Sequence, residues 1–300
     1  MKPASVSLHT LRVALWLLLP AAVPAAPATS RQEDIIYGRK DGTALTMDVF
    51  RPQEKTNGAG VILIVSGGWA SSHDAINVKF VEPFARRGYT VFAVVHGSNP
   101  KYFIPEIIPD IHRAVRFIRH HAARWNVDPA RLGATGASAG GHLALIVGTQ
   151  GGPGAADARD PVERESSAVQ AVACFFPPTD FNNYVKPGLN ALDESVLKNF
   201  RKFIGAIPED VAERDALGRR ISPIYSVSAK TAPTLIIHGE KDQHVLLHQA
   251  TSFTNAALRA GAEARLIIKP GAPHGWTNMT DDVETFALWF DEHLLKKAAP

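Results

Sequence analysis

The chain has 300 residues, of which 45% are hydrophobic and 20% charged, a composition that fits a globular protein and excludes a disordered or fibrous one. Its formal net charge is +3, and the charge near +1 that remains without the N-terminal segment described below argues against nucleic acid or an acidic polymer as the main partner. The interior contains no linker-like tract, charge run or fixed-period repeat, which favours one large domain over two small ones.

The first 28 residues have the layout of a secretory signal peptide. Lys2 and Arg12 form a basic start, an apolar run covers residues 13–23, and Ala26-Pro27-Ala28 has the A-x-A cleavage pattern. The apolar run of about eleven residues is too short to cross about 30 Å of bilayer as a helix. Removal of this segment takes away two cations and no acid, which leaves the net charge near +1.

We therefore predict a signal peptide over residues 1–28, cleaved after Ala28 or alternatively after Ala25, and a mature domain over residues 29–300. A secreted or periplasmic location follows, with no stable membrane insertion after cleavage. The alternative interpretation is an uncleaved N-terminal anchor.

The strands expected after the leader are of two kinds. Residues 35–38 and 45–50 alternate between polar and apolar side chains and can pair antiparallel at one edge of a sheet. Later runs are short, apolar throughout and rich in β-branched or aromatic residues, which is typical of strands buried on both faces of a parallel sheet. These runs are residues 61–65, 91–95, 171–176, 234–237 and 264–268.

Helical segments lie between these runs. Residues 109–123 place Ile111, Val115 and Ile118 on one face, and Pro109 suits a first helical turn. Residues 245–260 and 283–295 also have helical character. The alternation of strand and helix predicts an α/β fold, a doubly wound, mostly parallel sheet of about eight strands.

Residues 151–224 break the alternation. They contain one clear strand, together with segments near 192–204 and 208–217 that look helical. We interpret this region as a small cap or insertion over the carboxyl edge of the sheet, where ligands bind in open α/β sheets.

A candidate nucleophile lies in Gly136-Ala137-Ser138-Ala139-Gly140. This G-x-S-x-G sequence stands between a strand-like run, residues 131–135, and a helical segment, residues 142–147, which is the context of a nucleophile elbow. In such a turn the serine hydroxyl projects above the sheet, and the glycines avoid collision with neighbouring backbone. The N–H of Ala139, at the start of the helix, can donate to an oxyanion.

A pair of glycines follows the strand at 61–65, in Ser66-Gly67-Gly68-Trp69. A turn in this place can supply the second backbone donor of an oxyanion hole. We predict Gly68 and Trp69 as donors, with Gly67 as the alternative in register; a plain glycine turn is the competing interpretation.

The base and the acid are expected in two later loops. His274 follows the last strand through Pro270-Gly271-Ala272-Pro273, where the base of a Ser-His-Asp triad belongs. Asp242 follows the strand at 234–237, and a carboxylate there can fix the tautomer of the imidazole and stabilise the imidazolium. Glu240 and Asp180 are rival acids.

The remaining candidate residues are weaker. His96, directly after the strand at 91–95, is predicted to line the pocket, whereas His120 and His121 are expected on a solvated helix face. Cys174, the only cysteine, is expected to pack as a small buried hydrophobe. We expect neither a metal nor a cofactor, because the chain lacks an H-E-x-x-H sequence, paired-cysteine spacing, a P-loop and a G-x-G-x-x-G fingerprint.

Several motifs together resemble the esterase/lipase branch of the α/β hydrolases, in particular bacterial feruloyl and acetyl xylan esterase-like carboxylesterases. The resemblance covers roughly residues 35–295, and its specific parts are residues 127–133, 136–143, 178–181, 222–228, 235–242 and 271–276. It implies an α/β-hydrolase fold with Ser138 as nucleophile, Asp242 as acid and His274 as base.

Two departures from the family pattern fall near the expected acyl pocket. The family usually has His-Gly-Gly before the oxyanion turn, where this chain has Ser66-Gly67-Gly68. The family's usual Asn-Tyr-Arg after the strand at 91–95 is replaced by a sequence that begins His96-Gly97-Ser98.

These observations predict a serine hydrolase that cleaves a short acyl or aromatic acyl ester, either a small molecule or an ester carried on a plant polysaccharide. An amidase, peptidase or lactone hydrolase with the same triad is one alternative, and a noncatalytic binding protein of the same fold is another. Trp69 and Trp276 flank the expected oxyanion turn and base and can narrow the pocket. An aromatic group can either form an acyl wall or pack the insertion onto the sheet; its members are Phe175, Phe176, Phe181 and Tyr184.

Overall fold

The computed structural model of the chain describes residues 29–193 and 200–295. The predicted signal peptide, residues 1–28, lies outside the described residues. Within the described ranges, no helix combines the length and the apolar composition that crossing a membrane requires.

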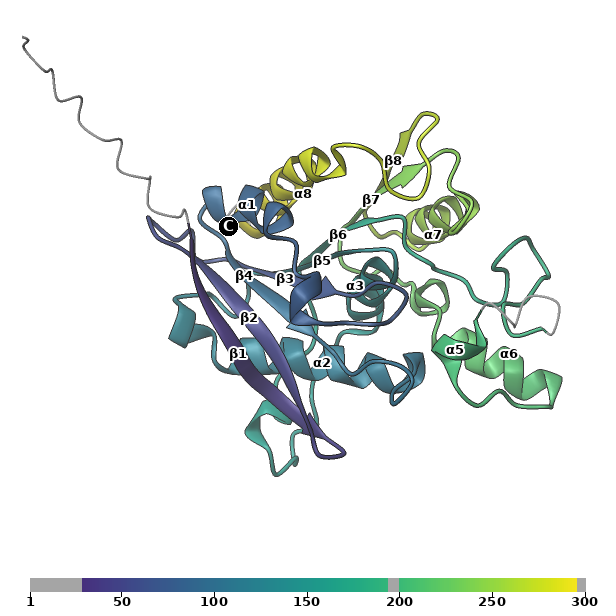
Figure 1. Cartoon of the computed structure of the whole chain (residues 1–300), viewed down its shortest axis with the longest axis horizontal. Helices are drawn as coiled ribbons and strands as arrows, with labels where there is room; N and C mark the ends of the chain where they lie inside the picture. Colours follow the sequence, from purple (N-terminus) through teal and green to yellow (C-terminus); the bar gives the residue numbers. More distant parts are fainter. Residues whose placement is uncertain (1–28, 194–199, 296–300) are drawn as a thin grey trace, which may run out of the picture.

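One eight-stranded sheet forms the centre of the domain, in the order β1-β2-β4-β3-β5-β6-β7-β8 (Figure 1). β1 pairs antiparallel with β2, and β2 pairs antiparallel with β4, whereas all later pairs are parallel. The predicted fold class and the antiparallel edge are therefore confirmed. The strands are β1 Thr29–Lys40, β2 Thr43–Pro52, β3 Gly60–Val65, β4 Thr90–Val95, β5 Leu132–Ala137, β6 Ala171–Phe175, β7 Thr234–Gly239 and β8 Ala264–Lys269.

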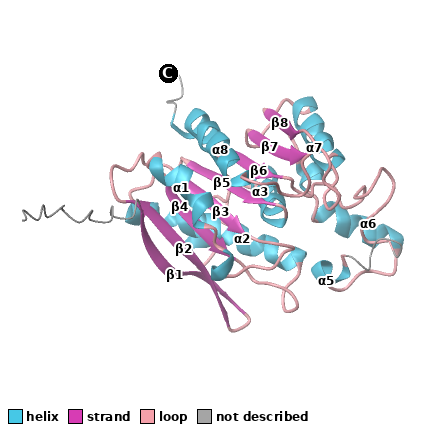
Figure 2. Ribbon diagram, turned by 45° about the horizontal axis from the view of Figure 1, so that its top comes forward, coloured by secondary structure: helices cyan, strands magenta, loops and turns pink. Residues whose placement is uncertain are grey.

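Helices cover both faces of the sheet (Figure 2). α1 and α8 pack on one face, and α2, α3 and α7 pack on the other. The α-helices are α1 Val78–Arg86, α2 Ile104–His120, α3 Ala139–Gln150, α5 Arg201–Ile204, α6 Val211–Arg220, α7 His248–Arg259 and α8 Val283–Phe290. The shorter elements are the 3₁₀ helices η1 His73–Ala75, η2 Ala122–Trp125, η3 Pro161–Arg164, η4 Pro223–Ser226 and η5 Met279–Asp282, and the π-turn η6 Asp291–Leu295.

The central strands are apolar throughout because each contributes to both helical layers. In β3, Val61, Leu63 and Val65 pack toward α1 and α8, whereas Ile62 and Ile64 pack toward α2 and α3. Cys174 of β6 is fully buried, as expected, and burial raises the pKa of its thiol well above the usual range. The central strands β3, β4, β5, β6 and β7 are thus a buried platform, whereas β1 and β8 at the two edges are partly exposed.

Two helices differ from the sequence prediction. α2 begins at Ile104, so the expectation that Pro109 occupies the first turn is wrong. The Glu106 carboxylate accepts a hydrogen bond from the Phe103 N–H at 3.0 Å, which fixes the earlier start, and Pro105 occupies the first turn instead. α1 is not predicted at all, since Pro83 lies within it and proline normally interrupts a helix.

The region expected as an insertion, residues 151–224, contains β6, which is a central strand of the sheet. Its helices α5 and α6 come after β6 and lie outside the two helical layers (Figures 1 and 2). Residues 194–199, within the helical segment expected near 192–204, lie outside the described residues. The Phe203 ring of α5 lies 5.1 Å from the ring of Trp69, so this region reaches the loop after β3.

The strand order reverses between β3 and β5, because the chain moves from β3 to β4 on one side and from β5 to β6 on the other. Ligands of open α/β sheets bind at the carboxyl ends of the strands beside such a reversal. The loop that contains Gly68 follows β3, and Ser138 follows β5. The topology therefore brings both predicted elements to the edge where a ligand is expected.

Candidate active site

Ser138 occupies a sharp turn between β5 and α3. Its backbone has φ 54° and ψ −118°, a conformation that a residue with a side chain rarely adopts. A Cβ on Gly136 would lie 2.5 Å from the carbonyl carbon of Gly140, and a Cβ on Gly140 would lie 2.4 Å from the carbonyl oxygen of Ile64. Both glycines of the G-x-S-x-G motif are therefore required by close backbone approach.

The structure brings together the three residues predicted as nucleophile, base and acid. Nε2 of His274 lies 3.1 Å from Oγ of Ser138, and Nδ1 of His274 lies 2.7 Å from Oδ2 of Asp242. The Asp242 side chain is fully buried, whereas that of His274 is 21% exposed. This geometry allows the serine hydroxyl to donate to Nε2 while Nδ1–H donates to the carboxylate.

Asp242 is held by several donors. Oδ1 accepts hydrogen bonds from the N–H groups of His244 at 2.9 Å and Val245 at 3.0 Å, and Nε2 of His238 lies 3.4 Å from Oδ2. Burial alone raises the pKa of Asp242, but the bonds from His238, His274 and Val245 outweigh burial and hold this pKa well below its usual range. The carboxylate is therefore ionised across the physiological range.

The two rival acids are engaged elsewhere. Asp180 accepts hydrogen bonds from the N–H groups of Asn182 and Asn183 and from the hydroxyl of Tyr225. Glu240 is exposed and accepts from the N–H of Gly271 at 2.7 Å. Of the three candidate acids, Asp242 alone has a hydrogen bond to His274.

The glycine pair after β3 forms a tight hairpin turn. Gly67 and Ala70 exchange two backbone hydrogen bonds, at 2.9 and 3.0 Å, and the two residues between them both have φ 55°. Positive φ at both central positions is the pattern of a type I′ turn. The N–H of Gly67 is occupied by Ala70, whereas the N–H groups of Gly68 and Trp69 make no hydrogen bond to the described residues. The geometry thus favours Gly68 and Trp69 over Gly67 as free donors.

The ring of Trp69 points into the core and is not among the residues that line the cavity described below. It is 4% exposed, and its Nε1–H donates to Nδ1 of His142 at 3.0 Å, while Nε2 of His142 donates to the carbonyl of Ile221 at 2.7 Å. Burial lowers the pKa of His142 to about 4, so this ring is neutral. These two hydrogen bonds, which we call the Trp69–His142 relay, hold Trp69 against α3. An aromatic residue at positive φ costs about 1–3 kcal/mol of conformational free energy, and the relay helps to offset this cost.

His142 is a residue that the sequence prediction missed. The signal was available, because His142 is the one polar side chain between Ala139 and Gly148 of α3, and such a residue needs a partner when buried. The identity of the partner was not accessible, since Trp69 and Ile221 lie on other elements far away in sequence.

His96 is placed at the same edge of the sheet, 4% exposed. Its Nε2 lies 2.9 Å from Oγ of Ser66, and its Nδ1 lies 2.5 Å from the carbonyl oxygen of Gly97. The two departures from the family pattern, at Ser66 and at His96, are therefore in direct contact. His96 itself is not among the residues that line the adjacent cavity.

A cavity of about 260 Å³ lies beside this edge. Ala137, directly before Ser138, and Gly67 of the hairpin form one side, and Met279 of η5 forms another. The rest of the lining is largely apolar and comes from β3, the turn after it and the segment around α1; it consists of Leu63, Ile64, Val65, Ser66, Ala75, Asn77 and Phe80. Met279 and the residues near α1 were missed in the sequence prediction because nothing local distinguishes them.

The predicted aromatic residues have packing roles. Trp276 donates from Nε1 to Asp282 at 2.8 Å and packs on Phe175 and Phe176, and it does not line the cavity. The ring of Phe176 lies 4.3 Å from that of His274, which supports the imidazole from one side. Phe181 and Tyr184 are buried beside Phe200 of the insertion. The interpretation of this group as packing is the one that fits these contacts.

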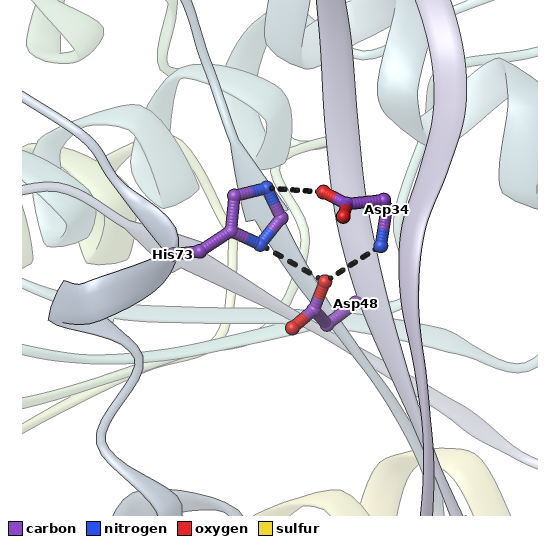
Figure 3. Close-up of side chains that lie close together, drawn as sticks. All are labelled: Asp34, Asp48 and His73. Atoms are coloured by element: carbon purple, nitrogen blue, oxygen red, sulfur yellow. Dashed lines mark hydrogen bonds and ion pairs between the residues drawn. The ribbon is translucent and has the colours of Figure 1, made fainter.

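A second polar cluster lies at the antiparallel edge, where His73 sits between the carboxylates of Asp34 and Asp48 (Figure 3). Oδ2 of Asp48 accepts from Nε of Arg31 at 2.7 Å, and Oδ1 accepts from the N–H of Asp34 and lies 2.9 Å from Nδ1 of His73. Both oxygens of Asp48 are already used by protein donors. The cluster is therefore an ion-pair network that fastens β1, β2 and η1 together.

Comparison with known proteins places these features in a family. The BD-FAE family model matches residues 47–257. The chain is 28% identical over 247 residues to Esterase LipQ of Mycobacterium tuberculosis, covering 78% of this chain and 54% of that protein. It is 25% identical over 265 residues to an ethyl acetate hydrolase of Pseudomonas putida, covering 84% of this chain and 77% of that protein. The chain spans little more than half the length of the first curated relatives it matches.

Solved structures of similar fold include a truncated carbohydrate esterase from gut microbiota, with a TM-score of 0.76 and 27% identity over 91% of this chain and 99% of that one. An acetyl ester-xyloside bifunctional hydrolase from Caldicellulosiruptor lactoaceticus has a TM-score of 0.73 and 23% identity, over 92% of this chain and 100% of that one. At 23% identity the second likeness concerns the fold alone.

Proposed function

The chain belongs to the BD-FAE family of α/β-hydrolase-fold proteins, and from that premise we propose that it hydrolyses carboxylic esters with Ser138, His274 and Asp242 as its catalytic residues. The observation that carries the proposal is the unbroken series of hydrogen bonds from Ser138 through His274 to Asp242. This series lies at the strand-order reversal, where a ligand is expected.

The geometry supports a two-step acyl transfer. Oγ of Ser138 attacks the ester carbonyl as Nε2 of His274 takes its proton, and Asp242 stabilises the resulting imidazolium. The carbonyl oxygen becomes an oxyanion, which accepts hydrogen bonds from the N–H of Ala139 and from Gly68 and Trp69. His274 then returns the proton to the departing alkoxide, and the alcohol leaves the acyl-enzyme. A water molecule then attacks the acyl-enzyme while Nε2 of His274 takes its proton. When the bond between the acyl carbon and Oγ of Ser138 breaks, His274 returns this proton to Oγ and the acid leaves.

The cavity supports a small acyl group as the substrate's acid part. Its volume of about 260 Å³ is below the range of about 300–1,000 Å³ that is usual for pockets holding drug-sized ligands. Its largely apolar lining suits a short alkyl chain or a single aromatic ring. A long lipid chain would need a larger apolar surface than this cavity offers.

The alcohol part of the substrate is proposed to be carbohydrate. The support is the likeness to a solved carbohydrate esterase and the signal-like leader, which would place the enzyme where polysaccharides are met. The ester-bearing substrate is then either a small glycoside or a polysaccharide.

Rates on acetyl, butyryl, octanoyl and feruloyl esters, with matched amides and lactones, test the proposed function. We expect turnover of the acetyl, butyryl or feruloyl esters, slow turnover of octanoyl esters, and labelling of Ser138 by a fluorophosphonate. Preference for octanoyl esters would contradict the pocket assignment, and faster amide or lactone cleavage would contradict ester specificity. Absence of labelling at Ser138 would favour a noncatalytic binding protein.

Met279 provides a test of the cavity as the acyl pocket. Met279→Ala removes side-chain volume from the cavity wall, so the ratio of kcat/KM for octanoyl over acetyl esters is expected to rise about tenfold. In a fitted apolar pocket, one additional methylene group of the substrate changes kcat/KM by about 10-fold or more. Met279→Trp fills the cavity and is expected to lower the butyryl-to-acetyl ratio. The matched control is Leu258→Ala, on the exposed face of α7. Unchanged ratios in both Met279 variants would refute this assignment.

A further inference from the structure

Ser66 and His96 occupy equivalent places at the ends of two paired strands. β3 and β4 run parallel with Val65 opposite Val95, so the next residue of each strand emerges at the same edge. Ser66 leads directly into the Gly67–Ala70 hairpin, and His96 leads into the loop formed by residues 96–98. The hairpin and this loop therefore lie side by side next to the candidate oxyanion site.

The hydrogen bonds define the direction of the contact. Nδ1 of His96 faces the carbonyl oxygen of Gly97 at 2.5 Å and must carry a proton to donate there. Burial lowers the pKa of His96 to about 4, so the ring is neutral and Nε2 holds a lone pair. The hydroxyl of Ser66 then donates to Nε2 across 2.9 Å.

The far end of the hairpin is fastened to the same loop. The N–H of Ser71 donates to Oγ of Ser98 at 2.8 Å, and the N–H of His96 donates to Oγ of Ser71 at 3.3 Å. Ser71 Oγ also donates to the carbonyl of Val65 at 2.5 Å. Both ends of the hairpin are thus attached to residues 96–98, and we call this arrangement the hairpin clamp.

The loop of residues 96–98 is itself held by hydrogen bonds. The carbonyl of Ser98 accepts from the N–H of Tyr102 at 3.0 Å, and the hydroxyl of Tyr102 donates to the carbonyl of Lys40 in β1 at 2.9 Å. The loop is therefore connected through Tyr102 to the edge strand β1. A loop fixed in this way can hold its neighbour in one orientation.

We propose that Ser66 and His96 are positioning residues that hold the N–H groups of Gly68 and Trp69 in the direction required by the oxyanion. This inference rests on the proposed function, because it assigns those N–H groups a role in the reaction. Donors of an oxyanion hole act at about 2.7–3.1 Å from the oxygen on which negative charge develops. A small rotation of the hairpin therefore reduces the stabilisation of the transition state more than it reduces the affinity for the bound substrate. Neither Ser66 nor His96 needs to touch the substrate for this effect.

The test compares Ser66→Ala, His96→Leu and the double variant, with an acetyl ester as substrate and rates normalised to sites titrated by a fluorophosphonate. Each single variant is expected to lower kcat by about 5- to 10-fold with KM within twofold, the size given by loss of one neutral hydrogen bond. The double variant is expected to lose no more than His96→Leu, since both changes remove the same contact. His96→Gln, which keeps an acceptor for Ser66, is expected to recover most of kcat.

The matched control is Ser72→Ala, an exposed neighbouring serine without a side-chain hydrogen bond to η1. Wild-type kcat in Ser66→Ala, or additive losses in the double variant, would overturn the clamp and leave the proposed function intact. A wild-type protein that turns over no ester would overturn the proposed function instead. In that case the rate constant for phosphonylation of Ser138 still tests the hairpin clamp. This rate constant is expected to fall in Ser66→Ala and His96→Leu, to fall no further in the double variant, and to recover in His96→Gln.

Discussion

Ser138→Ala is expected to lower kcat for ester hydrolysis by at least about 10⁴-fold, because loss of a triad serine removes the covalent route and leaves only the oxyanion site and binding. Oγ of Ser138 lies 3.1 Å from Nε2 of His274, and among the described residues no other hydroxyl or thiol has a hydrogen bond to this nitrogen. Alanine keeps the Cβ already present at this positive φ, so the turn itself gains no new strain. The measurement is kcat and kcat/KM with the best ester of the panel.

The thermal unfolding midpoint of Ser138→Ala should stay close to that of the wild type, and fluorophosphonate labelling should disappear. Ser72→Ala, with its serine on the surface nearby, serves as the control that keeps both activity and labelling. Activity of Ser138→Ala near the wild-type level would show that another residue is the nucleophile.

Asp242→Asn is expected to lower kcat by about 10⁴-fold, because it shifts His274 to the tautomer in which Nε2 carries the proton. The N–H groups of His244 and Val245 both donate to Oδ1, so the amide oxygen of asparagine must stay at that position. The amide NH₂ then replaces Oδ2, which faces Nδ1 of His274 at 2.7 Å. To accept from this NH₂, Nδ1 must lose its proton, which moves to Nε2, and Nε2 can no longer take the proton of Ser138.

Steady-state kinetics of Asp242→Asn, together with phosphonylation of Ser138, measure this effect. Glu240→Gln is the matched control, since Glu240 is the exposed rival acid in the same loop and makes no hydrogen bond to His274. A large loss in Glu240→Gln with a small loss in Asp242→Asn would reverse the assignment of the acid.

The sheet could be predicted from the sequence because each central strand is a short apolar run bounded by polar turns. β3, β4, β6, β7 and β8 lie within two residues of their expected bounds. In the first four strands, burial on both faces leaves few polar positions that interrupt the apolar pattern, whereas β8 is a partly exposed edge strand. Ser138, Asp242 and His274 could be found because each follows a strand, and parallel strands end at one edge. Chain order and topology therefore determine much of the site before any contact is known.

The remaining parts of the site depend on contacts between distant segments. The partner of His142 is Trp69, and the partner of His96 is Ser66; in both pairs the two residues belong to segments far apart in the sequence. Met279 lines the cavity from the short helix η5, whose sequence has no motif or hydrophobic periodicity that would mark it in advance. The unpredicted α1 has a different cause, since proline at its centre opposes the helix locally while Phe80, Val81 and Phe84 are buried in the core. Tertiary packing decides such elements, and a single sequence does not reveal it.

The acceptor of the Trp69–His142 relay is the carbonyl of Ile221, at the end of α6. The segment that contains α5 and α6 therefore also supports Trp69, the residue proposed as an oxyanion donor. In a chimera in which a relative's segment replaces α5 and α6, a second junction before Ile221 retains the acceptor of the relay, whereas a junction after Ser222 replaces it with the relative's backbone. The crossover point that preserves the relay therefore lies between Arg220 and Ile221.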